Sequence, residues 1–178
     1  MSKKVLILSS SPRKRGNSAT LCDRFAEGAR AAHHQVELVA IAEKNIHYCT
    51  GCYACKRTGE CAQKDDMAAV LDSMLQADVI VLATPVYFYT MCAQMKTVID
   101  RTVPRYTEIR GKEFYFIVAA ADTSKPAMEP TLQGFRAFTG LLPGSREKGV
   151  VYGTGAWQIG DIQNSPAMRQ AYEMGKAV

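Results

Sequence analysis

The feature that most constrains this chain is a regular alternation between short apolar runs and longer segments with helical periodicity. Apolar runs occupy residues 5–8, 36–41, 79–83, 114–120 and 150–153. We predict a strand from each run and a helix after each strand. The run at 79–83 is continuously apolar, which is typical of a central strand covered on both faces. This pattern predicts an α/β fold with a doubly wound, five-stranded parallel sheet.

The segments between the runs carry their apolar residues on one helical face. The first such helix places Leu21, Phe25 and Ala29 together, and further helices are expected from about 66, at 92–103, near 127–141 and from about 166. The chain has 178 residues, of which 47% are hydrophobic, and this suffices for one sizeable core. We therefore expect residues 1–178 to form a single domain.

The composition also bounds the location and the partners of the protein. The apolar stretch at the start of the chain ends at Ser9, too early for a signal peptide, and no later run is long enough to cross a membrane. The net charge of +5 is modest, and aromatic residues do not alternate with a basic stripe as on a nucleic-acid surface. We expect a cytoplasmic protein that binds neither membrane nor nucleic acid, and an anionic ligand suffices to explain the charge.

The segment after the first predicted strand is rich in hydroxyl and basic side chains, and it leads directly into a helix. It runs from Ser9 to Thr20 and contains Arg13 and Gly16. Free N–H groups at a helix N-terminus, serine hydroxyls and an arginine together suit a phosphate group, and glycine permits a tight turn. The alternative is a solvated turn that only caps the helix. Because ligands of doubly wound sheets bind beyond the carboxyl ends of the strands, the position favours phosphate.

Other kinds of phosphate site find little support in the sequence. There is no P-loop motif, and Gly153 and Gly155 are followed by Gln158 where a dinucleotide fingerprint requires a third glycine. No cysteine has an arginine six positions later, as a thiol phosphatase of this topology would require. Nucleoside triphosphates, a Rossmann cofactor and phosphatase chemistry are thus disfavoured.

Three separated blocks of the sequence resemble the NADPH-dependent FMN reductases and their relatives, the iron–sulfur flavoproteins. The blocks are 10–18, 84–88 and 96–101, and the resemblance spans roughly residues 4–103. It implies a flavodoxin-like sheet with strand order 2-1-3-4-5 and non-covalently bound FMN. It places Ser11, Arg13, Asn17 and Ser18 at the FMN phosphate, while Ser10 stands where glycine is usual. In the third block, Lys96 and Asp100 have the spacing of a helical ion pair.

The same resemblance assigns the flavin ring to the segment after the third strand. Pro85, Val86, Tyr87 and Phe88 would line the isoalloxazine, for which a stiff, apolar and aromatic loop is suitable. The alternative for these side chains is aromatic core packing at a strand end. Asp122, after the fourth strand, would meet the pyrimidine edge of the ring, although ordinary turn chemistry explains an aspartate there equally well.

Four of the six cysteines are concentrated in one short segment. Cys49, Cys52 and Cys55 are each separated by two residues, and Cys61 follows after five more. This compact spacing predicts a [4Fe–4S] cluster with four thiolate ligands, and it resembles the spacing in iron–sulfur flavoproteins. Structural zinc and a metal-free loop are the alternatives, although zinc sites usually separate two cysteine pairs by a longer loop.

These observations together predict an FMN-dependent oxidoreductase. It would accept hydride from NAD(P)H and pass electrons to a quinone, a flavin, another small acceptor or a redox protein, and the flavin would carry the chemistry without a catalytic acid–base pair. The alternative is an iron–sulfur flavoprotein that carries electrons between redox proteins. Carriers of the flavodoxin type are usually acidic, whereas the pI of this chain is about 8.9. The resemblance also implies a homodimer or homotetramer.

Overall fold

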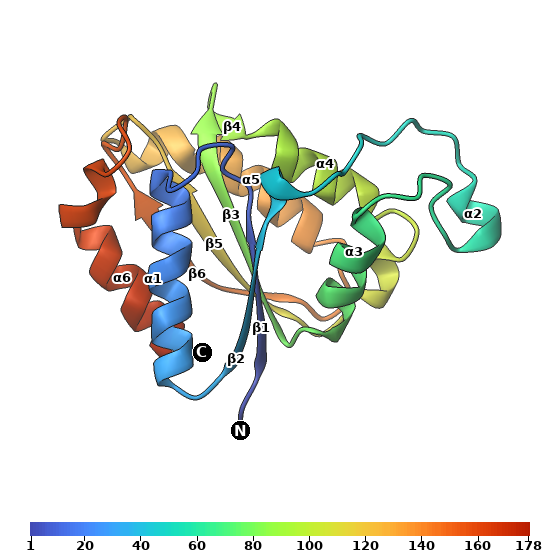
Figure 1. Cartoon of the computed structure of the whole chain (residues 1–178), viewed down its shortest axis with the longest axis horizontal. Coiled ribbons are helices and arrows are strands. Elements are labelled where there is room, and N and C mark those ends of the chain that lie inside the picture. The colour runs from blue at the N-terminus through green and yellow to red at the C-terminus, as the bar shows by residue number, and fades with distance from the viewer.

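A parallel sheet forms the centre of the computed structural model, which describes residues 1–178 (Figure 1). Its five parallel strands are β1 (Lys4–Ser9), β2 (Gln35–Ala40), β3 (Val79–Tyr87), β5 (Glu113–Ala119) and β6 (Arg146–Gly153). They are ordered β2-β1-β3-β5-β6, and the two-residue strand β4 (Thr90–Met91) pairs antiparallel with the end of β3. The predicted doubly wound sheet is confirmed. Its fourth and fifth predicted strands are β5 and β6, and β4 is an addition that the sequence did not reveal.

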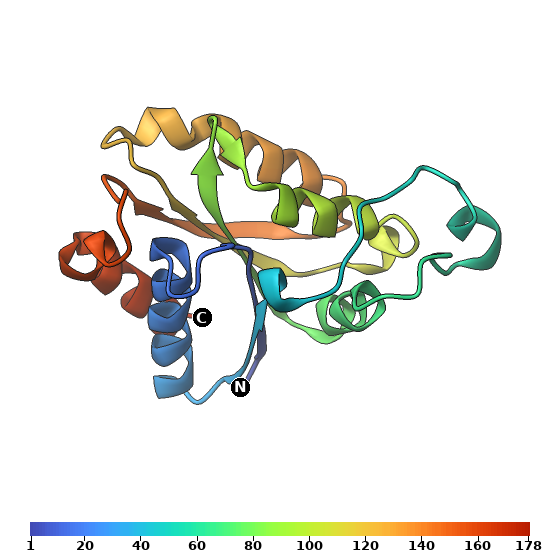
Figure 2. The same ribbon diagram turned by 45° about the horizontal axis from the view of Figure 1, so that its top comes forward.

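Helices cover both faces of this sheet. Helices α1 (Asn17–Ala31) and α6 (Pro166–Lys176) lie on one face, and α3 (Met67–Gln76), α4 (Ala93–Arg101) and α5 (Glu129–Thr139) lie on the other (Figure 2). The short helix α2 (Cys55–Thr58) sits in a loop that extends away from the body. Short 3-10 turns occupy Ile41–Glu43, Tyr106–Glu108, Lys125–Met128 and Asp161–Asn164. None of the helices is both long enough and apolar enough to cross a membrane.

The two-residue period of the strands divides the core into two layers. Val5 and Ile7 face α1 and α6, where they join the cluster that contains Phe25. Leu6 and Leu8 face the opposite way, into the cluster that contains Met74 on α3. Because both faces of the central strands are buried, these strands read as continuous apolar runs in the sequence.

Helices α1 and α6 pack with their backbones unusually close. A Cβ atom added to Gly28 of α1 would collide with the backbone carbonyl oxygen of Tyr172, and one added to Gly175 of α6 would collide with that of Phe25. Only glycine permits this approach at both positions. The contact holds the C-terminal helix against the helix that follows the first strand.

The third strand is longer than the sequence predicted. Pro85 and Tyr87, expected in a loop, belong to β3, and the chain then reverses through Phe88 and Tyr89 into β4. Pro85 lies beyond the end of the β1–β3 pairing, which stops at Ala83, so its missing N–H interrupts no bond to β1, and its remaining neighbour is Ala119 of β5. Both turn residues have positive φ, 48° and 65°, a strained conformation for aromatic residues.

Candidate functional site

A cavity of about 400 Å³ lies at the carboxyl ends of the central strands. It is bordered by the loop after β1, by the hairpin after β3, and by the segments that follow β5 and β6. The lining residues are Ser11, Arg13, Gly16, Asn17, Ser18, Pro85, Val86, Tyr87, Phe88, Ala119, Ala120, Ala121, Ala156 and Trp157. All the residues predicted at the phosphate and at the ring therefore line one cavity, with the exception of Asp122.

The N-terminus of α1 forms the polar side of this cavity. Its N-cap residue is Gly16, so no side chain caps the free N–H groups of the first turn. The hydroxyl oxygen of Ser18 is buried and has no hydrogen-bond partner. Unpaired donors beside the positive end of a helix favour an anion. A Cβ at Gly16 would come within 2.5 Å of Ser11 Oγ, so the tight turn that forms this side of the cavity depends on glycine.

Arg13 and Asn17 connect the loop after β1 to the segment after β6. Arg13 Nη1 donates to the carbonyl oxygen of Trp157 at 2.9 Å, and Asn17 Nδ2 donates to that of Gln158 at 2.8 Å. Asn17 Oδ1 accepts from the N–H of Gly160 at 3.2 Å. Asn17 Oδ1 is occupied within the chain, which leaves the free backbone N–H and the second N–H of Nδ2 for a ligand.

The opposite side of the cavity is apolar and aromatic. Pro85 and Val86 are half-buried, whereas Tyr87 is 40% exposed and Phe88 is 99% exposed. Trp157, which the sequence analysis did not single out, lines the same cavity and is 66% exposed. Trp157 follows the end of the last strand, and its position beyond the carboxyl end of a strand in a doubly wound sheet could have indicated a residue near the ligand.

Asp122 lies outside the cavity lining. Its carboxylate accepts a hydrogen bond of 2.7 Å from the N–H of Ser124, and its carbonyl oxygen accepts one of 2.8 Å from the N–H of Gly155. These contacts close a turn after β5, which is the alternative role that the sequence allowed for this residue.

All four clustered cysteines line a second cavity, of about 300 Å³. Cys49 and Cys52 are exposed, and Cys55 and Cys61 are half-buried. A hydrogen bond from the backbone of Ala54 and a second one from the Thr50 side chain lower the pKa of the Cys52 thiol. No group of three or more His, Cys, Asp or Glu side chains is arranged to hold a metal ion. The fold thus gathers the predicted ligands around one cavity without converging their sulfur atoms.

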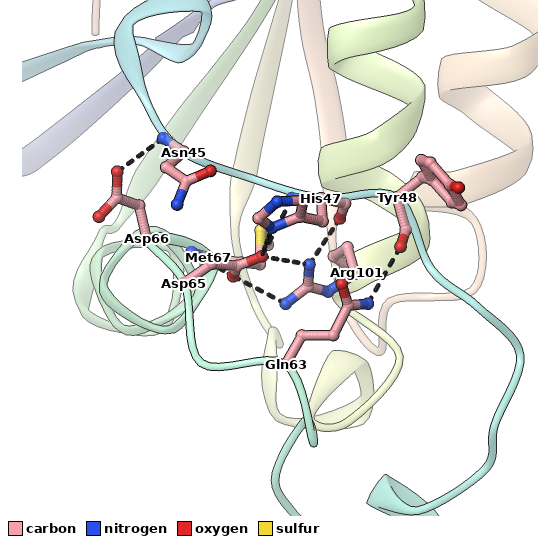
Figure 3. A network of polar contacts seen from close by, with 8 residues as sticks. All are labelled: Asn45, His47, Tyr48, Gln63, Asp65, Asp66, Met67 and Arg101. Atoms are coloured by element: carbon pink, nitrogen blue, oxygen red, sulfur yellow. Dashed lines mark hydrogen bonds and ion pairs between the residues drawn. The ribbon is translucent and has the colours of Figure 1, made fainter.

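The two ends of the cysteine loop, residues 49–62, are joined by a network centred on Asp65 (Figure 3). Asp65 accepts two hydrogen bonds from Arg101, at 2.7 and 2.8 Å, and one from the N–H of His47 at 3.0 Å. Arg101 Nη1 also donates to the carbonyl oxygen of His47 at 2.6 Å. The side chains of Asp65 and Arg101 are only 2% and 1% exposed. We call His47, Asp65 and Arg101 the clasp.

Two further residue pairs hold together the chain segments on either side of the clasp. Asn45 and Asp66 exchange two hydrogen bonds, one from Asn45 N–H to the Asp66 carboxylate at 2.8 Å and one from Asp66 N–H to the Asn45 carbonyl oxygen at 3.0 Å. The side chain of Gln63 donates to the carbonyl oxygen of Tyr48 at 3.0 Å. The base of the cysteine loop is therefore closed from residue 45 to residue 66.

Burial and pairing act in opposite directions on the clasp carboxylate. Burial alone would raise the pKa of Asp65, but hydrogen bonds from Arg101 and from the backbone of His47 and Met67 hold it well below its usual range. The hydrogen bond to Asp65 raises the pKa of Arg101, and the nearby Cys61 adds to this shift. Both groups are therefore charged, and the two form a buried ion pair.

Comparison with known proteins identifies the family. Residues 3–143 match the family model of the NADPH-dependent FMN reductases. The chain belongs to this family. Membership confirms the resemblance to this family that the three sequence blocks indicated.

Individual relatives match this chain over different lengths. An iron–sulfur flavoprotein of Archaeoglobus fulgidus is 41% identical over 118 residues, which is 65% of this chain and 54% of that protein. One of Methanocaldococcus jannaschii is 31% identical over 184 residues, 98% of this chain and 95% of that protein. The chain thus spans about half the length of the first relative and nearly all of the second.

A solved structure supports the fold. The NAD(P)H:quinone oxidoreductase from Methanothermobacter marburgensis superposes with a TM-score of 0.74 at 16% identity, covering 99% of this chain and 96% of that one. At this identity the likeness concerns the architecture, and it agrees with the predicted flavodoxin-like arrangement of sheet and helices.

Proposed function

We propose that the chain binds FMN in the 400 Å³ cavity, takes hydride from NAD(P)H and passes electrons to a quinone, a flavin or another small acceptor. The observation that carries this proposal is the pairing of two unlike sides in one cavity. One side holds the uncapped start of α1 with the unpartnered Ser18 hydroxyl, and the other holds the aromatic hairpin after β3. A monophosphate joined to a flat, largely apolar ring matches both sides.

The residues present fit FMN in two groups. Ser11, Arg13, Ser18 and the backbone N–H of Asn17 would hold the phosphate by charge-assisted hydrogen bonds. The ring would rest against the segment 85–88, whose rigid backbone offers donors and acceptors to the polar edge. Bound FMN would itself supply the hydride-accepting chemistry, so the chain needs only to bind the cofactor and leave it accessible.

We also propose that Cys49, Cys52, Cys55 and Cys61 hold a [4Fe–4S] cluster. Four thiols around one cavity are a suitable donor set, and the exposed loop leaves their sulfur atoms room to converge. Such a cluster would exchange single electrons, which supports electron transfer between redox proteins as the second candidate function. Exposed free thiols also suit a reducing compartment, and we therefore place the protein in the cytoplasm.

We further propose a homodimer or homotetramer, and the exposed surface around the cavity mouth supports this. Tyr87, Phe88, Tyr89, Trp157 and Ile159 are all large, apolar and at least 40% exposed. A monomer that leaves such a group uncovered would expose an interaction surface. Sedimentation of the FMN-loaded protein gives the mass of the assembly, and a monomer would contradict this part of the proposal.

The first experiment tests FMN binding by titration of the apo-protein. Arg13→Ala should weaken binding by about 1.5–3 kcal/mol if the charged hydrogen bond is made. Lys14→Ala is the matched control, because Lys14 is an adjacent cation outside the cavity lining. Equal affinities of the two variants would remove Arg13 from the site.

The second experiment separates the enzyme from the electron carrier. Bleaching of bound FMN by NADH and NADPH is followed anaerobically by stopped flow, and steady-state turnover is measured with a quinone. Fast bleaching and turnover support the reductase, whereas a flavin that neither nucleotide reduces supports the carrier.

A third experiment tests the cluster. Iron, acid-labile sulfide and zinc are assayed after anaerobic reconstitution. Protein with FMN but without sulfide would exclude the cluster.

A further inference from the structure

Arg101 is a buried cation at the C-terminal end of α4, and one of its three nitrogens has no hydrogen-bond partner. Arg101 donates three hydrogen bonds, two to the Asp65 carboxylate and one to the carbonyl oxygen of His47, as described for the clasp. Its Nε–H is buried and has no hydrogen-bond partner. Leaving a charged donor unpaired inside a protein is costly, and such groups are rare in native structures. The Nε–H is therefore available to an acceptor that is not in place in the metal-free chain.

The same arginine borders the cavity of the cysteine loop. Arg101 and all four clustered cysteines line this 300 Å³ cavity, and Arg101 together with Cys61 also lines the adjoining one. The two neighbouring cavities thus share one guanidinium and one thiol. Arg101 is the cation on the protein side of a site whose proposed occupant is surrounded by negative sulfur atoms.

We propose that Arg101 is the positioning residue of the cysteine site, closing the loop through the clasp and donating its Nε–H to a metal-bound sulfur. The inference rests on the proposed function, since it takes the cysteines to be metal ligands. It adds a second layer to that site, in which a group that is not a ligand fixes the ligands and stabilises their charge.

Two physical effects are expected from this arrangement. The clasp joins His47 and Asp65 on either side of the loop, so the segment 49–62 starts from a closed base and loses less conformational freedom when its sulfur atoms converge. The guanidinium also lies beside a centre with four thiolates. A hydrogen bond from the guanidinium to a sulfur favours the more negative, reduced form of such a centre and raises its reduction potential.

Arg105 provides a matched comparison on the next turn of the chain. Like Arg101, it is an arginine paired with a carboxylate, here with both Asp72 and Glu108, but its side chain is 37% exposed. It lines the adjoining cavity and not the one that the cysteines line. A general effect of disrupting an arginine–carboxylate pair would also appear at Arg105, whereas the proposed role belongs to Arg101 alone.

The test uses the full chain loaded with FMN. Removing Arg101 alone would leave Asp65 buried and unpaired, so the principal variant is the double substitution Asp65→Asn/Arg101→Gln, which removes both charges. Arg101→Lys keeps the charge and loses the planar donor fork, and Arg105→Gln is the control. Affinity for Co²⁺ alone is measured anaerobically from its thiolate charge-transfer bands, and the reduction potential of the reconstituted cluster is measured by paramagnetic resonance.

We expect the double variant to bind Co²⁺ about 10- to 100-fold more weakly, as is usual when outer contacts of a metal site are removed, and to have a lower cluster potential. Arg101→Lys should restore part of the potential but little of the Co²⁺ affinity. Arg105→Gln should match the unmodified protein, and retained FMN affinity shows that each variant is folded.

Two results would overturn the inference, and they are distinguishable. If the double variant keeps the unmodified Co²⁺ affinity and potential, Arg101 has no positioning role while the cluster itself stands. If the unmodified chain binds neither Co²⁺ nor iron and sulfide at its cysteines, both the cluster and the role of Arg101 fail.

Discussion

Two buried donors without partners mark the two cavities at the level of single residues. Ser18 Oγ lies in the cavity assigned to FMN, and Arg101 Nε lies beside the cysteine loop. A buried polar atom without a partner costs stability, so we expect each of these two donors to form a hydrogen bond with a ligand. Ser145 and Ser165 also carry such hydroxyls, but they lie outside both cavity linings and therefore serve as internal comparisons.

Ser18→Ala separates binding from stability. Because the Ser18 hydroxyl has no partner in the ligand-free chain, its removal should leave the free energy of unfolding of the apo-protein unchanged or slightly raised. FMN affinity should fall by about 1.5–3 kcal/mol, since a hydrogen bond to a charged phosphate is lost. Denaturant titration and FMN titration measure the two quantities. Ser145→Ala should reproduce the first effect without the second, and loss of stability in Ser18→Ala would contradict the assignment.

Spacing along the sequence predicts some side-chain pairs but not those between residues far apart in the chain. Lys96 and Asp100 are four residues apart, and the predicted ion pair forms at 2.6 Å. Asp65 and Arg101 are 36 residues apart, and nothing in the spacing relates them. The sequence therefore identified Arg101 only as part of a family block. Its burial, its partner and its unpaired Nε–H depend on how α4 packs beside the start of α3, which is a tertiary property.

At the level of elements, burial decides what the sequence reveals. The strands β1 and β3 are buried on both faces and were predicted from their apolar runs. The sixth strand begins at Arg146, four residues before its predicted start, because its first residues are exposed and polar at the edge of the sheet. The short α2 and β4 lack any periodic pattern. The hairpin turn was missed because its positive φ values fall on Phe88 and Tyr89, where glycine or asparagine is typical.

Two helical glycines should respond oppositely to alanine. Gly28→Ala places a Cβ against the backbone of α6, which can make room only if the whole helix moves. We therefore expect the free energy of unfolding to fall by about 1–3 kcal/mol. Gly134→Ala in α5 meets only the flexible end of Met91, and higher helix propensity should stabilise the chain by up to about 1 kcal/mol. Denaturant unfolding of both variants tests the pair. Equal effects would show that the contact between α1 and α6 is adjustable.

At the level of the whole molecule, Cys22 links folding to pH. Burial raises the pKa of its thiol from 9.0 to about 12. The folded chain therefore keeps a proton that the unfolded chain releases above pH 9, and stability falls as the pH rises between these values. No such contribution exists below pH 9, where both states are protonated.

Removing this thiol should flatten the alkaline loss of stability. In Cys22→Ala, the difference in unfolding free energy between pH 8 and pH 10 should be smaller than in the unmodified chain by about 1.4 kcal/mol. Leu21→Ala, a neighbouring core substitution without a titratable group, should lower stability but keep the original pH dependence. Denaturant unfolding at both pH values gives the comparison, and identical slopes in all three proteins would mean that Cys22 ionises normally in the folded state.

Helix α4 governs which insertions and deletions the molecule can tolerate. Just before its first turn, Cys92 Sγ lies 3.1 Å from Ser10 Oγ in the loop after β1, and its last residue, Arg101, belongs to the clasp. One residue added between these ends would lengthen the helix by about 1.5 Å and turn Arg101 by about 100°, away from Asp65. Point substitutions can therefore diversify the chemistry of either cavity, while the length of α4 keeps their separation constant.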